Sequence, residues 1–224
     1  MITLAKLTID AHGGLDRWKQ FESASAKLRQ GGALWQLKGH PETLTETGVT
    51  VGLRTEWASH SPFGADGRRT RFEPGRVALE AGDGTVLGEL RDPRPSFAGH
   101  VLETPWSDLQ LAYFVGCAMW TYLNIPFLLA WPGVECEELS PWKENGESWR
   151  RLGVTFPGSV ATHSSKQTLY IDELGHVKRH DYDVEISGGT PAVHYIDTYV
   201  DVSGNQISNG TSDIPASGRR KRQS

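Results

Sequence analysis

The sequence predicts an α+β protein in which a curved antiparallel β-sheet, a half-barrel, wraps around a buried central helix, with a further helix at the N-terminus. Two observations predict the sheet: short β-like segments fill residues 24–90, and three longer ones follow between residues 162 and 202. A third predicts the helix, because residues 109–134 contain no charged side chain. A helix that is apolar on nearly every side must be surrounded, and the flanking strands are the available container.

The N-terminal segment is expected to be a helix that packs against the sheet. Apolar residues recur at helical intervals over residues 2–12, and Gly13 and Gly14 end the pattern. Strands are then expected at residues 24–28, 33–38, 49–57, 69–72, 77–80 and 86–90. The Gly-Asp-Gly sequence at residues 82–84 is typical of a hairpin turn between the last two strands.

The central helix has clear start and stop signals. Two prolines within residues 91–100 exclude a regular element there and predict a crossing loop that could act as a lid. Thr104 then reads as the N-cap, with Pro105 at the first helical position and Asp108 in the first turn. The helix is expected to end near Leu123, because a proline follows shortly after.

The uncharged span could also be read as a membrane-spanning helix on its length alone. Gly116, Asn124 and two prolines interrupt it, so we expect a buried helix followed by an apolar loop, and no membrane span. Residues 141–146 then predict a turn that leads into a strand at residues 149–156.

The last three strands are expected at residues 162–172, 177–186 and 192–202 and form a meander. Pairing of Asp172 with Val177, and of Ile186 with Ala192, places Gln167 opposite Tyr182. Alternation divides the middle strand into two faces. The face expected to be exposed to water carries Arg179, Asp181, Asp183 and Glu185.

The opposite face of this meander is apolar except for a few polar side chains, which are the candidate site. They are His163, Gln167, His180, Tyr182 and His194. His163 and His194 lie two strands apart, which is too far for an easily shared ion, so no metal is expected. Two readings stay open: hydrogen-bonded histidines of the core, or groups that contact a ligand.

Composition limits the function and the location. The body of the chain is acidic, and the basic residues of the end lie at 219–222, so we expect no nucleic-acid-binding surface. Cys117 and Cys136 form no metal or redox spacing. The N-terminus lacks the pattern of a secretory signal, so the cytoplasm is the expected compartment. One domain is predicted over residues 1–203, followed by a disordered basic tail at 204–224.

The order of elements is similar to the half-barrel of bacterial outer-membrane lipoprotein carriers and receptors, the Lol superfamily. Residues 11–18 (AHGGLDRW), 118–123 (AMWTYL), 179–182 (RHDY) and 192–195 (AVHY) resemble segments of uncharacterised bacterial proteins with that fold. The resemblance covers about residues 10–202. It implies the fold and a lipophilic cavity, and no catalytic residue. The tail does not resemble the closing strands of such a barrel.

The sequence therefore favours a protein that binds a hydrophobic small molecule or lipid between the curved sheet and the central helix. Trp120, Tyr122 and Phe127 would form apolar walls. The polar contacts would come from His163, Gln167, Tyr182 and His194. Phosphate loops, zinc motifs and dinucleotide fingerprints are absent from the sequence, so no cofactor is expected.

The alternative is an enzyme that acts on such a ligand without a cofactor, as a cyclase, isomerase or dehydratase. His180 or His194 would transfer a proton and Tyr182 would donate a hydrogen bond, because histidine titrates near neutral pH. The sequence predicts neither the ligand nor the oligomeric state.

Overall fold

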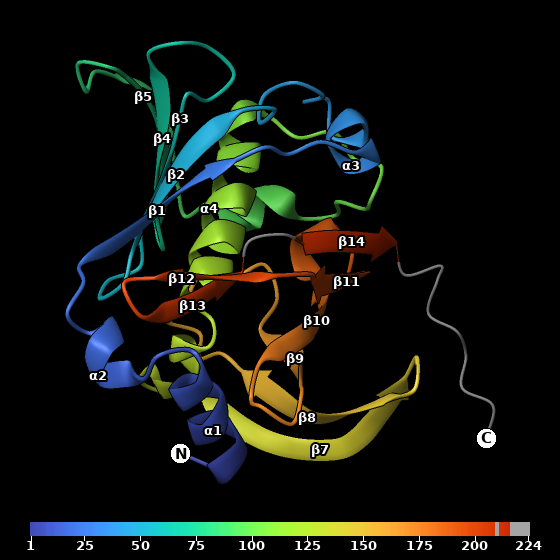
Figure 1. The fold of residues 1–224 in the computed structure, drawn as a ribbon. Coiled ribbons are helices and arrows are strands. Elements are labelled where there is room, and N and C mark those ends of the chain that lie inside the picture. The colour runs from blue at the N-terminus through green and yellow to red at the C-terminus, as the bar shows by residue number, and fades with distance from the viewer. Residues whose placement is uncertain (209–210, 216–224) are drawn as a thin grey trace.

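The protein has the predicted α+β fold, with a long helix, α4 (Asp108–Asn124), between two antiparallel sheets (Figure 1). The structure, a computed structural model, describes residues 1–208 and 211–215 of the 224-residue chain. The predicted half-barrel is divided into two curved six-stranded sheets, and they do not close into a barrel within the described ranges. The central helix and the N-terminal helix are both confirmed.

The first sheet has its strands in sequence order, from β1 to β6. They are β1 (Ser23–Leu28), β2 (Thr47–Gly52), β3 (Ala58–Ser61), β4 (Arg68–Glu73), β5 (Arg76–Ala81) and β6 (Val86–Arg91). The hairpin predicted at residues 82–84 joins β5 to β6. This sheet is the support on which α4 lies.

The second sheet has the order β14-β11-β10-β9-β8-β7, and β12 and β13 form a separate two-stranded hairpin. The strands are β7 (Glu135–Glu144), β8 (Glu147–Thr155), β9 (Lys166–Ile171), β10 (Val177–Val184), β11 (Thr190–Ile196), β12 (Tyr199–Val202), β13 (Asn205–Ser208) and β14 (Thr211–Pro215). The hairpin crosses in front of the C-terminal end of α4 in Figure 1.

Short helices complete the chain at its ends and corners. They are α1 (Thr3–Ala11), α2 (Leu15–Trp18), α3 (Ala33–Leu37) and the 3₁₀ helices η1 (Arg94–Phe97), η2 (Phe127–Ala130) and η3 (Glu185–Ser187). α1 and α2 are separated by the predicted pair Gly13 and Gly14, both with positive φ.

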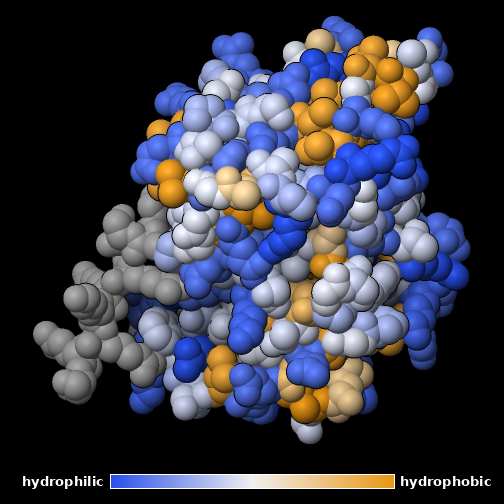
Figure 2. All heavy atoms as spheres, turned by 180° about the vertical axis from the view of Figure 1, so that it is seen from behind, coloured by the Kyte–Doolittle hydropathy of each residue, from blue (hydrophilic) through white to orange (hydrophobic). Residues whose placement is uncertain are grey.

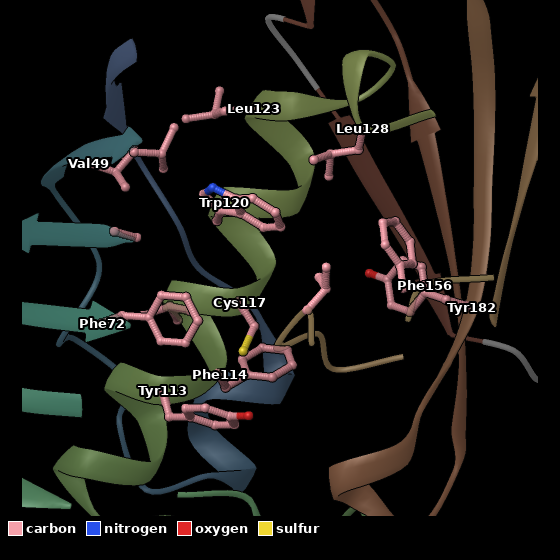
Figure 3. Packing of buried hydrophobic residues seen from close by; sticks show 14 of the residues in the cluster. Val49, Phe72, Tyr113, Phe114, Cys117, Trp120, Leu123, Leu128, Phe156 and Tyr182 are labelled. Carbon is pink, nitrogen blue, oxygen red and sulfur yellow. The ribbon is translucent and has the colours of Figure 1, made fainter. Parts of the chain in front are cut away.

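α4 packs closely on the first sheet, against β2 to β5. Gly116 permits the approach, because a Cβ at this position would lie 2.4 Å from Cγ of Phe72 on β4. Figure 3 shows Val49 and Phe72 on this side of the helix and Phe156 and Tyr182 on the side of the second sheet. Gly116 therefore lets α4 lie directly against the first sheet.

The helix begins later than Thr104, the residue predicted to cap it. Ser107 is the N-cap: its hydroxyl accepts the backbone N–H of Gln110 at 3.3 Å, and the Gln110 side chain accepts the N–H of Ser107 at 3.0 Å. This reciprocal capping box satisfies the backbone N–H groups of Ser107 and Gln110, so the helix begins here and not at Thr104.

The prediction of a strand at residues 33–38 is wrong, because these residues form helix α3 and its C-cap. Lys38 follows the helix with a fully buried side chain, and its ammonium lies 2.7 Å from the Leu102 carbonyl and 3.1 Å from that of Thr104. This long-range contact, rather than local propensity, determines the local structure. The sequence also missed β3, and the turn at residues 141–146 is the end of the long hairpin β7–β8.

The meander has the predicted faces. Gln167 lies opposite Tyr182 as expected, and His180 lies directly opposite His194. Tyr182 pairs with Ala192, which shifts the second pairing by an even number of residues and so preserves the side-chain faces.

The outer face of β10 is not exposed to water as predicted. Arg179 and Asp181 are only 5% and 7% exposed. Their guanidinium and carboxylate form two hydrogen bonds of 2.7 Å, and aromatic rings of neighbouring strands cover them. Alternation places these residues on the correct face but does not reveal which side chains cover that face.

The folded part extends beyond residue 203, where the sequence placed its boundary. β13 pairs with β12, and β14 closes the second sheet along β11. These strands are rich in Ser, Asn and Thr, so they lack the apolar alternation by which strands are recognised. The basic run at 219–222 lies outside the described residues.

Candidate functional site

The structure brings together six of the predicted site residues between α4 and the second sheet. Strand alternation directs side chains of β9, β10 and β11 toward α4, whose C-terminal half contributes Tyr122. This polar–aromatic cluster consists of Tyr122, His163, Gln167, His180, Tyr182 and His194, and four of them lie on the three central strands.

Gln167 links the cluster to the segment that precedes β9. Its amide nitrogen donates to the Ser164 carbonyl at 2.9 Å and to Oγ1 of Thr162 at 3.2 Å. Its oxygen lies 2.7 Å from Nε2 of His180. Because the amide orientation is determined by the Ser164 carbonyl, His180 must be the donor in this contact.

His163 is the least satisfied member of the cluster. It is fully buried, and neither ring nitrogen has a hydrogen-bond partner in the described part of the chain. The ring lies edge-on to Tyr182 at 4.7 Å between centroids and 5.6 Å from Phe114. The hydroxyls of Tyr122 and Tyr182 bond to each other beside it. Buried polar atoms without partners are uncommon and indicate strain or function.

Burial determines the charge of these histidines. It lowers the pKa of His163 to about 4 and holds the pKa of His180 well below its ordinary value, with neighbouring histidines contributing in the same direction. Both rings are therefore neutral near pH 7. They can accept a proton or a hydrogen bond there, but they do not act as imidazolium acids.

Two predicted walls of the site lie elsewhere. The indole nitrogen of Trp120 donates to the Gly52 carbonyl of the first sheet at 2.9 Å, so its polar atom is used there and not in the cluster. Phe127 is stacked on Trp18 at 4.1 Å. Both belong to the apolar core.

A hollow of about 340 Å³, the larger hollow, lies where the two sheets meet beside α4. Its walls include Arg94, Tyr113, Phe156, Val160, Ala161 and Thr162. Tyr113 comes from α4, and the last four come from the connection between β8 and β9. Thr162 is the residue held by Gln167, so the predicted cluster supports one wall of this hollow.

Charged groups lie at the edge of the larger hollow. Arg94 donates to the Thr162 carbonyl at 2.6 Å and bonds to Glu185. Behind the wall, Glu56 accepts the N–H of Ala161 at 3.2 Å, while its other oxygen is buried without a partner among the described residues. Burial raises the pKa of Glu56 to about 8.

A smaller space of about 30 Å³, the histidine hollow, lies at the other end of the cluster. His180, His194 and Tyr122 line it together with His12, which the sequence analysis did not select. Across the described ranges, no group of three or more His, Cys, Asp or Glu side chains is arranged to hold a metal ion. None of the described helices is long and apolar enough to span a membrane.

The sequence analysis missed several residues that border these hollows. Arg94 belongs to the crossing loop predicted at residues 91–100. The sequence indicated this loop as a possible lid but did not select Arg94 as a site residue. His12 lies within the segment 11–18 that carries the resemblance but was not selected as a site residue, and Glu56 gave no signal, because each depends on contacts with distant parts of the chain.

The comparisons with known proteins show the fold. No family model matches this chain, and no curated protein matches its sequence. A DUF1329 family protein from Desulfovibrio piger is similar in structure, with a TM-score of 0.53 and 10% identity over 96% of this chain and 85% of that one.

Two further structures are more distant. A LolA superfamily protein from Nitrosomonas europaea has a TM-score of 0.45 and 10% identity, over 87% of this chain and 75% of that one. A protein from Vibrio parahaemolyticus, described as a putative outer membrane lipoprotein-sorting protein domain, has a TM-score of 0.44 and 10% identity, over 77% of this chain and 71% of that one. The predicted likeness to uncharacterised bacterial proteins is confirmed, as a likeness of fold, by the DUF1329 family protein.

Proposed function

We propose that this protein binds a hydrophobic small molecule or lipid beside α4, where the helix faces the second sheet. The observation that carries the proposal is the larger hollow. Its volume of about 340 Å³ lies within the range of roughly 300–1,000 Å³ that is typical of ligand sites. Phe156 and Val160 are apolar wall residues, and Arg94 and Thr162 add a few polar groups, as such sites require.

The surface supports an interior site. Figure 2 shows a back face that is mainly hydrophilic, with hydrophobic patches separated from one another. A hydrophobic ligand would therefore bury little apolar area on this face. The larger hollow instead offers walls on several sides, from α4, from η1 and from the connection between β8 and β9.

The polar–aromatic cluster has a supporting role in this proposal. Gln167 holds Thr162 in the wall, and His180 holds Gln167. His163 is two residues from Ser165 and adjacent to Thr162, both of which line the hollow. Both its ring nitrogens are buried without a hydrogen-bond partner among the described residues, next to the wall residue Thr162.

The enzymatic alternative would use the same cluster. His180 is neutral and donates through Nε2, so its Nδ1 could accept a proton from a substrate. Such a reaction needs substrate within hydrogen-bond reach of that ring, and the histidine hollow has room for few atoms. Binding without chemistry is therefore the function that the geometry favours.

Two measurements test binding. Native mass spectrometry of protein purified from its own host should detect a co-purifying lipophilic compound. Titration with Nile red, a neutral dye, should show saturable binding that Ala161→Phe weakens at least about tenfold by filling the hollow. The control Val86→Phe changes a side chain that is 47% exposed on β6 and should bind the dye normally. Equal binding by both variants would contradict the proposed site.

A further inference from the structure

The histidine hollow has a chemistry different from that of the larger hollow. Its lining includes His12, Tyr122, Ile125, His180, His194 and Ile196, and the two hollows share no lining residue. His12 comes from the end of α1, Ile125 follows α4, and His180 lies on β10. Three distant parts of the chain thus place two histidine rings and an apolar side chain around one small space.

The protonation of His12 follows from its hydrogen bond. Nδ1 lies 2.7 Å from the Thr8 carbonyl, which can only accept, so Nδ1 carries the hydrogen. Burial lowers the pKa of His12 to about 4, and the ring is neutral near pH 7. Nε2 therefore has a lone pair, for which the described residues provide no donor.

The same reasoning applies to His180 with the nitrogens exchanged. Nε2 donates to Gln167, whose amide orientation is determined by the Ser164 carbonyl. Nδ1 is then the acceptor, and it has no bonded donor in the described ranges. The two rings together offer two acceptor lone pairs, and hydrogen bonds to other parts of the protein hold both tautomers in place.

We propose that the histidine hollow is a binding site for the hydroxyl group of a neutral alcohol. The hydroxyl donates its hydrogen to His12 Nε2 or His180 Nδ1, and the apolar part of the alcohol lies against Ile125 and Ile196. This site goes beyond the proposed function, because it is separate from the larger hollow.

Charge and size select this class of ligand. A carboxylate would bring a negative charge against two lone pairs, and an ammonium would be buried without a counter-charge, since no carboxylate is among the lining side chains. The volume of about 30 Å³ exceeds the 10–15 Å³ or so that a water molecule needs, but it leaves room for only one or two heavy atoms. A hydroxyl and its carbon fit, whereas the remaining carbons of a longer alcohol extend out of the hollow; a phosphate, whose oxygens surround one atom, does not fit.

The test uses the wild-type protein and three small probes that differ only in their polar group: 1-butanol, butyrate and butylammonium. Nitrogen-15 spectra of the histidine rings at neutral pH should first show hydrogens on Nδ1 of His12 and Nε2 of His180. Addition of 1-butanol should then shift the signal of the acceptor nitrogen that takes the hydroxyl hydrogen, Nε2 of His12 or Nδ1 of His180. Butyrate and butylammonium should bind at least about tenfold more weakly.

Variants separate this site from the larger hollow. His12→Phe removes one acceptor and should weaken butanol binding several-fold, whereas Ala161→Phe should leave it unchanged. Equal binding of butyrate or butylammonium, or the absence of any shift at saturating butanol, would overturn the inference. Neither result would affect Nile red binding at the larger hollow, so the two proposals can fail independently.

Discussion

At the scale of the residue, two buried groups are poorly satisfied and lie beside the proposed ligand site. His163 has two unpaired ring nitrogens, and Glu56 has one unpaired carboxyl oxygen within the described chain. Leaving a buried polar group without a partner costs about 1–3 kcal/mol. Residues that reduce stability in this way and adjoin a hollow are candidates for a functional role, because function commonly opposes stability.

His163→Phe should stabilise the protein by about 1 kcal/mol, since it removes the unpaired nitrogens and keeps an aromatic ring among Phe114, Tyr122 and Tyr182. The folded-state pKa of His163 is about 4, below the ordinary 6.5. The wild type therefore loses stability as the pH falls through that window, and the advantage of the variant should grow.

Urea denaturation measures this difference in the free energy of unfolding. The matched variant is His180→Phe, which should be destabilising because it leaves the Gln167 oxygen without its donor. A His163→Phe protein that is less stable than the wild type would contradict the reasoning.

Glu56→Gln should change how stability depends on pH. Burial raises the folded-state pKa of Glu56 from 4.5 to about 8. Its stabilising contribution is therefore present below 4.5 and is lost as the pH rises through about 8. Glutamine keeps an acceptor for the Ala161 N–H and does not titrate.

We expect the free energy of unfolding of the wild type, relative to Glu56→Gln, to fall on the order of 4 kcal/mol between about pH 5 and about pH 9, since about three pH units separate pH 5 from the folded-state pKa and each corresponds to about 1.4 kcal/mol. Denaturant titrations of both proteins across this range provide the measurement. Parallel stability profiles would show that Glu56 is not buried as described.

At the scale of the element, the outer face of the second sheet is held by a buried charged network. Arg179 bonds to Asp181 through two contacts of 2.7 Å and to Glu144 at 2.7 Å. Tyr170 donates to Asp181 at 2.8 Å. The network connects β7, β9 and β10 on the side opposite α4. It can hold the strands whose inner faces carry the polar–aromatic cluster.

Arg179→Ala should destabilise the protein by about 3–5 kcal/mol, because the buried carboxylate of Asp181 loses its ion pair and both hydrogen bonds to the guanidinium. Arg150→Ala is the control: Arg150 pairs with Glu138 at 2.7 Å, but both side chains are about 40% exposed, so the loss should be below about 1 kcal/mol. Thermal and urea unfolding distinguish the two. A mild effect at Arg179 would mean that solvent reaches the network.

At the scale of the whole molecule, the C-terminal strands contact two parts of the structure that border the candidate sites, β11 and the end of α1. β14 pairs with β11, which carries His194, and the N–H of Gln206 on β13 donates to the His12 carbonyl at 3.1 Å. Ser208 lines the histidine hollow. Residues 205–208 and 211–215 are therefore part of the folded domain, and Ser208 is part of one candidate site.

A chain that ends after residue 203 should be less stable than one that ends after residue 215, because it exposes the edge of β11 and loses the contacts of β13. We expect its free energy of unfolding, measured by denaturant titration, to be lower by about 2 kcal/mol or more. Butanol binding should weaken in the shorter chain alone. Equal stability of the two chains would instead support the domain boundary predicted at residue 203.

The sequence by itself determined the fold class and the inner face of the meander. Both depend on local periodicity: residues 109–134 lack charge, and alternate residues of β10 are sorted to opposite faces. This is why Gln167, His180, Tyr182 and His194 were selected correctly as neighbours, although their pairing shifts along the strands.

Only the tertiary structure decided what surrounds those residues. Lys38 is buried among carbonyls far away in the chain, aromatic rings cover Arg179, and His12 lines the same hollow as His180, which is distant in the sequence. Such contacts join segments that no local pattern connects. Gly116 likewise lets α4 lie against Phe72 of the first sheet, and no periodicity in the sequence encodes that approach.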